Sequence, residues 1–344
     1  MVTIHDVAKA AGVSETTVSL VLRGKQCRVS EQTRQRVLDA ADQLHYVPNQ
    51  VAVSLVTRKT YTIGLIYSDM LNPFYAELAL GIERNAYLHD YSLLICNCDE
   101  QVSRCIDSIT LLEGRCVDGF VLQPPESVNN SPEQLHQLQQ KLSSCSTPYV
   151  ILDRAIHDVY HDYISADHRL GGYLATEHLV RLGHTRIGCI TGAFSDYGVK
   201  RRLAGYQDVL QQHGIAYDPS LIYEGLYQVE TGYRGALELF KKNITAIFAF
   251  SDLIAVGVQR AAAECGICIP HDLSLVGYDD SYVANLCSVP LTTIRQPIEL
   301  LGRRACEMLL DRIQDPDKPH QDYFYPPALI QRSSCSMPRS LSHA

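Results

Sequence analysis

The chain has 344 residues, 46% of them apolar and 20% charged, which is the balance of a folded protein with more than one domain. No apolar stretch reaches the roughly 18 residues of a membrane span. The polar start of the chain also lacks the apolar region of a signal peptide, so we expect a cytoplasmic protein with no membrane partner. The twelve cysteines are scattered along the chain, which favours reduced thiols over a disulfide framework.

The formal net charge of −8 is divided unevenly along the chain. Residues 1–60 hold eight Lys and Arg against five Asp and Glu, a net charge of +3, which leaves −11 for the remainder. A basic segment joined to an acidic body is typical of a small domain that contacts phosphates, carried by a larger domain that nucleic acid repels.

The segment from Thr3 to Gly24 predicts two short helices joined by a tight turn at Gly12. Thr3 and Ser14 lie where N-cap oxygens accept hydrogen bonds from the first backbone N–H groups of a helix. Because each helix turns its apolar face toward the other, the second helix keeps an outer face for base edges in a major groove. That face is predicted to carry Glu15, Thr16 and Ser19. The alternative is a plain helical hairpin with no DNA-binding function.

A third helix is predicted from Glu31 to Leu44, with Ser30 before it as the N-cap. Its apolar side is expected to consist of Val37, Leu38, Ala41 and Leu44. The three helices form a headpiece at 1–47, and Pro48 opens a hinge or linker at 48–60.

From Tyr61 onward, strands alternate with helices, which predicts parallel α/β structure. We expect strands near Ile63–Tyr67, Ser92–Cys96, Gly119–Leu122, Tyr149–Leu152, Arg186–Ile190, Ala246–Phe250 and Leu273–Val276. Helices are expected near Phe74–His89, Ser103–Glu113, Pro132–Leu142, Leu170–Leu182, Lys200–His213, Thr231–Phe240 and Leu253–Glu264. Two similar lobes follow one another, and the cleft between the carboxyl ends of their strands is the expected ligand site.

Seven stretches stand in one order along the chain: T-I-H-D-V-A-K-A-A-G-V-S from Thr3, N-P-F-Y at 72–75, G-G-Y-L-A-T-E-H-L at 171–179, L-G-H-T-R-I at 182–187, R-L-A-G-Y at 202–206, P-H-D-L-S-L-V-G-Y-D-D at 270–280 and P-L-T-T-I-R-Q-P at 290–297. Together they resemble the lac repressor/galactose repressor family of bacterial transcription regulators. The resemblance covers essentially the whole chain. It implies a small all-α helix-turn-helix headpiece plus an α/β core of two periplasmic-binding-protein-like lobes with parallel sheets.

The core is expected at 61–335, followed by a tail at 336–344. Its first lobe is expected at about 61–161 plus 294–322, and its second lobe at about 162–293 plus 323–335.

Because helix-turn-helix heads that recognise palindromic sites need two-fold symmetry, we expect a homodimer. An apolar stripe after Pro297 is predicted to face either the core or that interface: Ile298, Leu301, Ala305, Met308 and Leu309. The tail has no leucine heptad, so the tetramer-forming coiled coil of some relatives is not expected.

The resemblance also implies roles in DNA binding. The helix that begins near Glu15 would enter the major groove, with Thr17 and Asn49 nearer to phosphates or sugars. Leu20 stands where many relatives carry Arg and cannot donate to guanine, so the operator is expected to differ from the common family half-site. Leu55 aligns with the family's hinge leucine, which wedges into a minor-groove step; the alternative is that it seals the linker against the core. The predicted DNA-binding residues are Thr3, Ser14, Glu15, Thr16, Thr17, Ser19, Asn49 and Leu55.

The predicted ligand-binding residues are Asn72, Phe74, Tyr75, Asp153, Arg154, Arg202, Ser251, Asp252, Asp279 and Gln296. Carboxylates and guanidinium groups would orient sugar hydroxyls, while Phe74 and Tyr75 cover the apolar face of the ring. Arg154 follows Asp153 as in ribose-type binding proteins, whereas the purine-sensing branch usually has an aromatic residue there. Asp252 has an alternative role as a helix N-cap.

The sequence therefore predicts a transcriptional repressor whose binding to a palindromic operator is controlled by a small ligand, with a sugar as the first expectation. A nucleobase or another metabolite is the alternative ligand. A sugar-binding transport receptor is the alternative class, but it would carry an export signal and no helix-turn-helix. The sequence has no nucleophile elbow, metalloprotease motif or phosphate-binding loop, so we expect neither an enzyme nor a cofactor or metal.

Overall fold

The computed structural model describes residues 2–22, 29–47, 59–156, 158–159 and 161–339. They fall into two units, which divide between Thr60 and Tyr61. We call the first unit the headpiece and the second the core.

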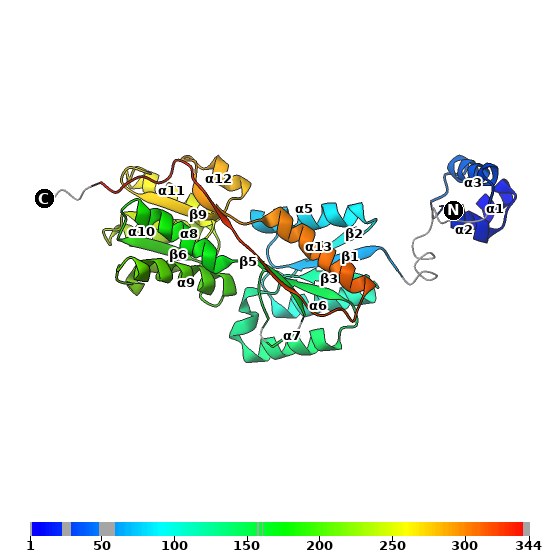
Figure 1. Ribbon diagram of the computed structural model, residues 1–344, viewed down its shortest axis with the longest axis horizontal. Coiled ribbons are helices and arrows are strands. Elements are labelled where there is room, and N and C mark those ends of the chain that lie inside the picture. Colours follow the sequence, from blue (N-terminus) through cyan, green and yellow to red (C-terminus); the bar gives the residue numbers. More distant parts are fainter. Residues whose placement is uncertain (1, 23–28, 48–58, 157, 160, 340–344) are drawn as a thin grey trace. The chain divides into compact units, whose positions relative to one another are not determined.

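The headpiece contains α1 (Ile4–Ala11), α2 (Glu15–Leu22) and α3 (Glu31–Gln43) (Figure 1). Gly12 ends α1 with a φ of 64°, a left-handed conformation that glycine adopts without strain. The hydroxyl of Ser14 accepts from the backbone N–H of Thr17 at 3.2 Å, and Ser30 caps α3 in the same way. Val7, Val18 and Val37 are fully buried where the three helices meet.

One residue of the predicted apolar side of α3 is placed differently. Leu38 is 41% exposed, and Ala40 takes its place in the core beside Val37 and Ala41. The buried face of α3 therefore lies part of a turn around the helix from the face that we predicted.

The first sheet of the core has the order β11-β5-β4-β3-β1-β2, and all of its strands run parallel. Its strands are β1 (Thr62–Tyr67), β2 (Ser92–Asn97), β3 (Gly119–Leu122), β4 (Tyr149–Leu152), β5 (Asp162–Ala166) and β11 (Asp322–Tyr325). Its helices are α5 (Pro73–Leu88), α6 (Val102–Gly114), the 3-10 helix η1 (Glu126–Asn130), α7 (Pro132–Ser144) and α13 (Ile298–Gln314). Side chains of α5 and α13 share one hydrophobic cluster with the sheet, and side chains of α6 and α7 share another. The apolar stripe of α13 lies in the first of these clusters, so it forms core.

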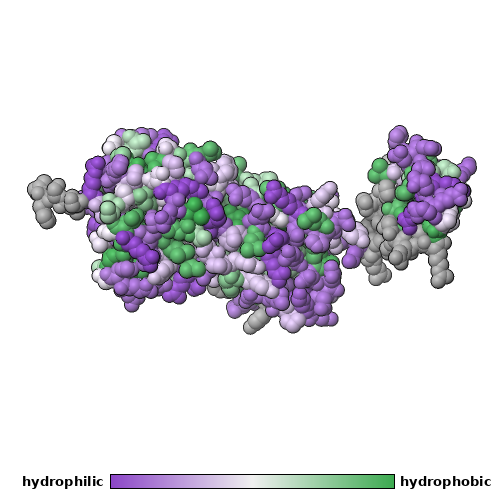
Figure 2. All heavy atoms as spheres, turned by 45° about the horizontal axis from the view of Figure 1, so that its top comes forward, coloured by the Kyte–Doolittle hydropathy of each residue, from purple (hydrophilic) through white to green (hydrophobic). Residues whose placement is uncertain are grey.

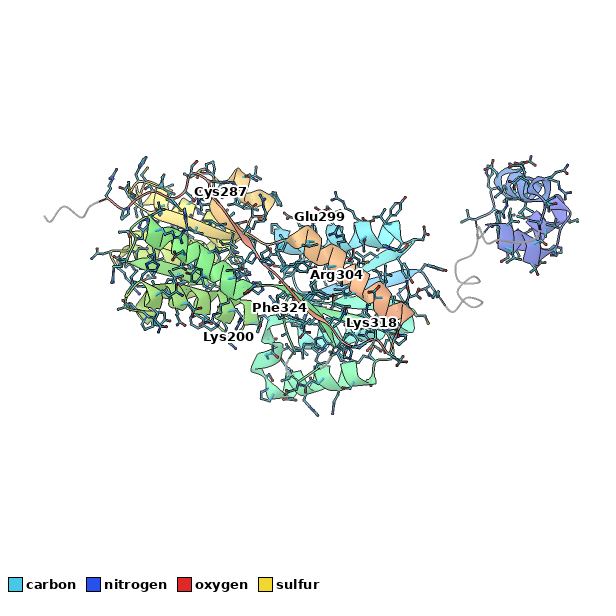
Figure 3. The ribbon with its side chains drawn as sticks, in the orientation of Figure 1. Lys200, Cys287, Glu299, Arg304, Lys318 and Phe324 are labelled. Atoms are coloured by element: carbon cyan, nitrogen blue, oxygen red, sulfur yellow. The ribbon has the colours of Figure 1, made fainter. Side chains whose placement is uncertain are left out.

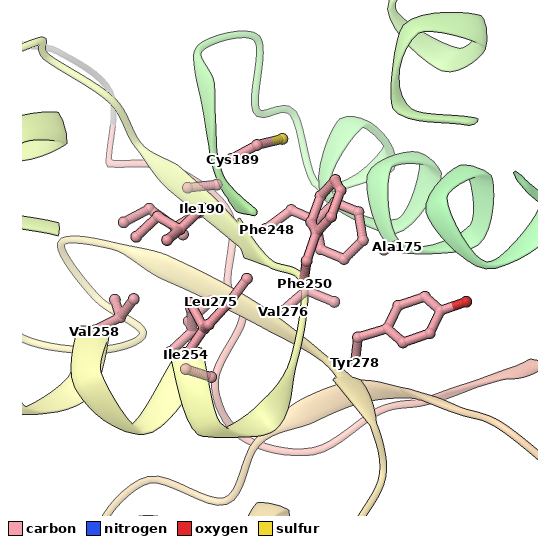
Figure 4. Packing of buried hydrophobic residues seen from close by; sticks show 14 of the residues in the cluster. Ala175, Cys189, Ile190, Phe248, Phe250, Ile254, Val258, Leu275, Val276 and Tyr278 are labelled. Carbon is pink, nitrogen blue, oxygen red and sulfur yellow. The ribbon is translucent and has the colours of Figure 1, made fainter. Parts of the chain in front are cut away.

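The second sheet repeats this arrangement with the order β12-β10-β9-β8-β6-β7, in which only β12 runs antiparallel to its neighbour. Its strands are β6 (Ile187–Thr191), β7 (Ile222–Glu224), β8 (Ala246–Ala249), β9 (Ser274–Asp279), β10 (Thr292–Arg295) and β12 (Ala328–Ile330). Its helices are α8 (His168–Arg181), α9 (Tyr197–Gln212), the 3-10 helix η2 (Pro219–Leu221), α10 (Val229–Phe240), α11 (Asp252–Glu264) and α12 (Tyr282–Leu286). Phe248, Phe250 and Tyr278 pack together at its centre (Figure 4).

The lobe boundaries differ from those expected. Both β5 and β11 pair within the first sheet, whereas we had assigned 162–293 and 323–335 to the second lobe. The chain therefore crosses between the sheets after β5, after β10 and after β11, and the last crossing is visible as the long red segment in Figure 1. On β11, Phe324, labelled in Figure 3, packs edge to face on Tyr163 of β5 with ring centroids 5.6 Å apart.

Helix pairs in the second lobe approach each other through glycine. A Cβ atom built on Gly172 of α8 would lie 2.0 Å from the carbonyl oxygen of Arg202, and one on Gly205 of α9 would lie 2.1 Å from that of Arg169. Only glycine allows the two backbones to come this close. The packing of α8 on α9 thereby determines where the side chain of Arg202 can point.

The face shown in Figure 2 carries many hydrophilic residues, with apolar patches between them. Among the helices that the structure describes, none combines the length and the apolar character needed to cross a membrane. No disulfide joins the cysteines within the described residues.

Candidate functional site

The carboxyl ends of both sheets face one cavity of about 30 Å³. It is lined by Asn72, Phe74, Tyr75, Asp153, Arg154, His168, Asp196, Gly198, Arg202, Tyr227, Asp279 and Gln296. Eight of the ten predicted ligand-binding residues are among them. Residues from distant parts of the chain therefore converge at the edge where parallel sheets place their functional groups.

Asp153 follows β4 and is held at the cavity by His168, the first residue of α8. His168 Nε2 lies 2.9 Å from Asp153 Oδ1, and the backbone of Asp153 has a φ of 65°. Burial by itself raises the pKa of Asp153, but the hydrogen bond and charge of His168, together with the charges of Arg154 and Arg202, outweigh burial and leave this pKa below its ordinary value. The cavity therefore contains a fixed carboxylate.

Arg154 joins the two lobes through carboxylates. Its Nη1 donates to Glu100 Oε1 at 2.8 Å within the first lobe, and its Nε forms an ion pair with Asp196 Oδ2 of the second lobe at 2.9 Å. Glu126 Oε2 lies 3.9 Å from Nη2, and the hydroxyl of Ser195 donates to Glu126 Oε1 at 3.4 Å. Burial raises the pKa of Glu126 to about 7, against the opposing attraction of Arg154. These contacts form an interlobe ion-pair cluster, made of Arg154, Glu100, Glu126 and Asp196.

Arg202 approaches the cavity from α9. Its guanidinium lies over the ring of Tyr278, 3.7 Å from the ring centroid, and donates to the carbonyl oxygen of Phe250. Its Nε is buried and forms no hydrogen bond among the described residues. A buried N–H without a partner is costly, so this donor is suited to an acceptor on a bound molecule.

Asp279 ends β9 with a φ of 108°, and Gln296 follows β10 beside it. The side-chain amide of Gln296 donates to Asp279 Oδ1 at 2.8 Å, while Gln296 Oε1 is buried with no hydrogen-bond partner within the described chain. Burial raises the pKa of Asp279 to about 7, although Arg202 and Gln296 oppose this shift. The pair therefore offers acceptors to a hydroxyl group.

Aromatic rings complete the wall that the first lobe contributes. Asn72 caps α5 by accepting from the backbone N–H of Phe74 at 3.1 Å, which fixes the start of the helix. Phe74 packs edge to face on Tyr75, and Tyr75 stacks on Tyr67 with centroids 5.8 Å apart. The rings are thus held by one another as well as by the helix.

Two predicted residues, Ser251 and Asp252, do not line this cavity. The hydroxyl of Ser251 accepts from the backbone N–H of Ile254 at 3.2 Å, so Ser251 is the N-cap of α11. Asp252 accepts from Ser281 and from the hydroxyl of Thr293, at 2.8 and 2.7 Å. Both side chains have internal partners that explain their burial, and the N-cap role suggested for Asp252 belongs to its neighbour.

Four lining residues were not predicted: His168, Asp196, Gly198 and Tyr227. His168 follows β5, Asp196 and Gly198 follow β6, and Tyr227 follows β7. Asp196 had a usable signal, because an Asp before a helix that follows a predicted strand is a typical N-cap at the ligand edge. His168 and Tyr227 follow strands of five and three residues that we did not predict.

In the headpiece, the structure describes six of the predicted DNA-binding residues, and Asn49 and Leu55 lie outside the described residues. Glu15 and Thr16 are exposed on the first turn of α2, whereas Thr17, Ser19 and Leu20 are partly buried. Glu15 Oε1 lies 2.9 Å from His5 Nδ1 of α1. The start of α2 therefore presents polar groups outward, as a DNA-reading helix must.

Sequence comparisons match both units. Residues 3–49 match a family described as "Bacterial regulatory proteins, lacI family", and residues 176–335 match "Periplasmic binding protein-like domain". The HTH-type transcriptional repressor PurR of Aliivibrio salmonicida is 34% identical over 336 residues, which cover 97% of this chain and 99% of the relative.

Two solved structures are similar in fold. The lac repressor dimer bound to operator and the anti-inducer ONPF has a TM-score of 0.86 and 29% identity, over 97% of this chain and 99% of that one. A regulator from Enterococcus faecium with bound ribose has a TM-score of 0.73 and 31% identity, over 81% of this chain and 100% of that one. The helix-turn-helix headpiece, the two-lobed core and the relatives agree, and the chain belongs to the LacI family of DNA-binding transcriptional repressors.

Proposed function

We propose that this repressor binds a palindromic operator as a homodimer and that a sugar in the interlobe cavity controls its binding. The observation that carries the proposal is the convergence of fixed charges and amide groups from both lobes on one cavity. A ligand held by groups of both lobes changes how the lobes sit relative to each other, and such a change is able to control DNA binding.

The chemistry of the cavity favours a molecule with several hydroxyl groups. A hydroxyl both donates and accepts, so it can satisfy the orphaned Oε1 of Gln296 and the orphaned Nε of Arg202. Asp153 adds a charged acceptor, Asp279 adds a second acceptor whose ionised form a donor from the ligand favours, and Phe74 offers an apolar surface to the ring carbons. The relative from Enterococcus faecium that has bound ribose supports this class of ligand.

A nucleobase is the second candidate because PurR is among the relatives. Arg154 argues against it, since the purine-sensing branch of the family usually has an aromatic residue after the Asp. In this chain the guanidinium at that position is taken up by the interlobe ion-pair cluster.

The cavity must enlarge to accept any such ligand. Ligand pockets measure roughly 300 Å³ or more, whereas this cavity measures about 30 Å³, the room of a water molecule. Separation of the lobes would break the Arg154–Asp196 pair, so the ligand competes with an internal contact for the same cleft. This competition couples occupancy of the cavity to lobe position.

A two-fold axis is required because each headpiece recognises one half-site of a palindrome. The exposed face of α5 provides an apolar surface for a second copy: Leu80, Tyr87 and Leu88 are 46%, 75% and 77% exposed. On the second lobe, Tyr282 and Leu286 of α12 are 60% and 75% exposed. The lac repressor relative is a dimer, which supports the same assembly here.

A selection from pooled random duplexes tests the function. We expect wild-type protein to enrich a palindrome with half-sites about one helical turn apart. The selected duplex is then titrated with protein in the presence of a panel of monosaccharides and nucleobases. One sugar should change operator affinity roughly 5- to 150-fold. A response to nucleobases alone would replace the sugar by the second candidate, and the absence of any enriched sequence would contradict the proposal.

A further inference from the structure

We infer that Glu15 selects cytosine at one fixed position of each operator half-site and that His5 orients its carboxylate for this contact. The inference rests on the proposed function, because it names a base that the headpiece recognises. It concerns a contact between α1 and α2 that the ligand cavity does not use.

The contact holds the first residue of one helix against another helix. Glu15 begins α2, and His5 is the second residue of α1. His5 Nδ1 lies 2.9 Å from Glu15 Oε1, and the two side chains are 72% and 53% exposed. The Ser14 cap fixes the backbone at this point, so the position of the carboxylate depends mainly on His5. The pair stands at the surface of the helix that a helix-turn-helix places in the major groove.

A carboxylate can only accept hydrogen bonds, and this restricts the bases it can contact. In the major groove guanine presents two acceptors and thymine presents an acceptor and a methyl group. Adenine has an N6 donor, but its N7 acceptor lies beside that donor and repels a carboxylate. Cytosine presents the N4 donor without a neighbouring acceptor on its own edge. Glu15 therefore favours cytosine, whereas the hydroxyls of Thr16 and Ser19 both donate and accept and are more tolerant.

His5 has a positioning role. Because an ionised carboxylate only accepts, His5 Nδ1 must be the donor in this pair. The hydrogen bond occupies Oε1, and Oε2 forms no hydrogen bond among the described residues. Oε1 of Glu15 is therefore held by His5, and Oε2 is left to accept a hydrogen bond from the base. Without His5, the carboxylate would be free to turn away from the phosphate backbone, which repels it.

The experiment compares wild-type protein with Glu15→Gln, His5→Gln and His5→Leu in the pooled duplex selection. The control is Glu31→Gln, which removes the same charge from the first residue of α3 and whose side chain is 87% exposed. Wild type and Glu31→Gln should enrich the same half-site, with cytosine at one fixed position. Glu15→Gln should change that base to adenine, because an amide pairs with adenine N6 and N7. His5→Gln keeps an N–H donor and should retain cytosine, whereas His5→Leu should lose the preference at that position alone.

Affinity measurements on the selected operator quantify the contact. For wild type, replacing the cytosine by thymine should weaken binding about 5- to 150-fold. For Glu15→Gln the same replacement should have little effect. If Glu15→Gln enriches the wild-type site with cytosine unchanged, the assignment of Glu15 is overturned while the proposed function stands. If His5→Leu also keeps the full preference, the positioning role of His5 is overturned. A wild-type protein that enriches no sequence would overturn the proposed function and this inference with it.

Discussion

Among the cavity residues of the second lobe, Asp279 is the one whose replacement should weaken ligand binding most. It combines a strained backbone angle, a hydrogen bond from Gln296 and a position on the cavity wall. Burial raises its pKa to about 7, so near neutral pH it is partly protonated until a donor from the ligand favours the ionised form.

We expect Asp279→Asn to weaken ligand binding about 10- to 150-fold, the effect of losing a charged hydrogen bond. Operator binding without ligand should stay near that of wild type if the ligand is an inducer, and the variant should fail to repress if the ligand is a corepressor. Operator affinity with and without the selected sugar, followed by fluorescence anisotropy, measures both effects. Asp107→Asn, at an exposed position of α6, is the control for loss of one negative charge. A full ligand response in Asp279→Asn would remove Asp279 from the site.

Glu126 makes the stability of the core depend on pH. The pKa of Glu126 is about 7 in the folded protein and 4.5 in an unfolded chain. Between pH 4.5 and pH 7 the folded state therefore binds more protons than the unfolded state. The contribution of Glu126 to stability is therefore fully present below about pH 4.5 and is lost as the pH rises through about 7. Glu126→Gln should remove part of this slope and be more stable than wild type at pH 8, by on the order of 1–3 kcal/mol.

Urea unfolding at several pH values tests this expectation. The chain contains no tryptophan, so circular dichroism is the suitable signal. Glu133→Gln, exposed at the start of α7, should leave the slope unchanged. Parallel pH profiles for Glu126→Gln and wild type would show that folding does not raise the pKa of Glu126.

At the scale of elements, the close packing of α8 on α9 determines the position of Arg202 and Asp196. Gly205→Ala places a methyl group 2.1 Å from the carbonyl oxygen of Arg169, and neither backbone can move without shifting its helix. We expect a loss of about 1–3 kcal/mol or more in stability, together with weaker ligand binding. Urea unfolding and ligand titration measure the two effects. Gly114→Ala at the end of α6, where a Cβ meets nothing within 4 Å, should be neutral or slightly stabilising. A stable Gly205→Ala protein with normal ligand affinity would contradict this account.

The proposed homodimer would bury the exposed apolar face of α5. Leu88→Glu would place a charge in the proposed interface, where its desolvation is not compensated, and should raise the dimer dissociation constant at least about 10-fold. Leu111→Glu, on the exposed side of α6 at 48% exposure, is the matched control. Sedimentation equilibrium should find wild type and Leu111→Glu as dimers and not as tetramers. A dimeric Leu88→Glu protein would move the interface elsewhere.

Most elements were predictable because their signals are local. The Ser14 and Ser30 caps and the left-handed Gly12 mark the ends of the headpiece helices within a few residues of sequence. The short strands were harder to predict. All five residues of β5 are buried, so its sequence D-Y-I-S-A shows no alternation of polar and apolar residues. That omission moved the predicted lobe boundary, because β11 pairs with β5.

Local signals in the sequence were enough to predict the family, the three-helix headpiece, the alternation of strands and helices, and eight residues of the cavity wall. These follow from local periodicity, helix caps and motifs. The folded chain was needed to show that Arg154 is shared among Glu100, Glu126 and Asp196, that Ser251 is a cap, and that His5 contacts Glu15. The sequence offers each of these side chains several charged or polar groups as possible partners. That choice depends on which groups the folded chain brings within about 3 Å of each other.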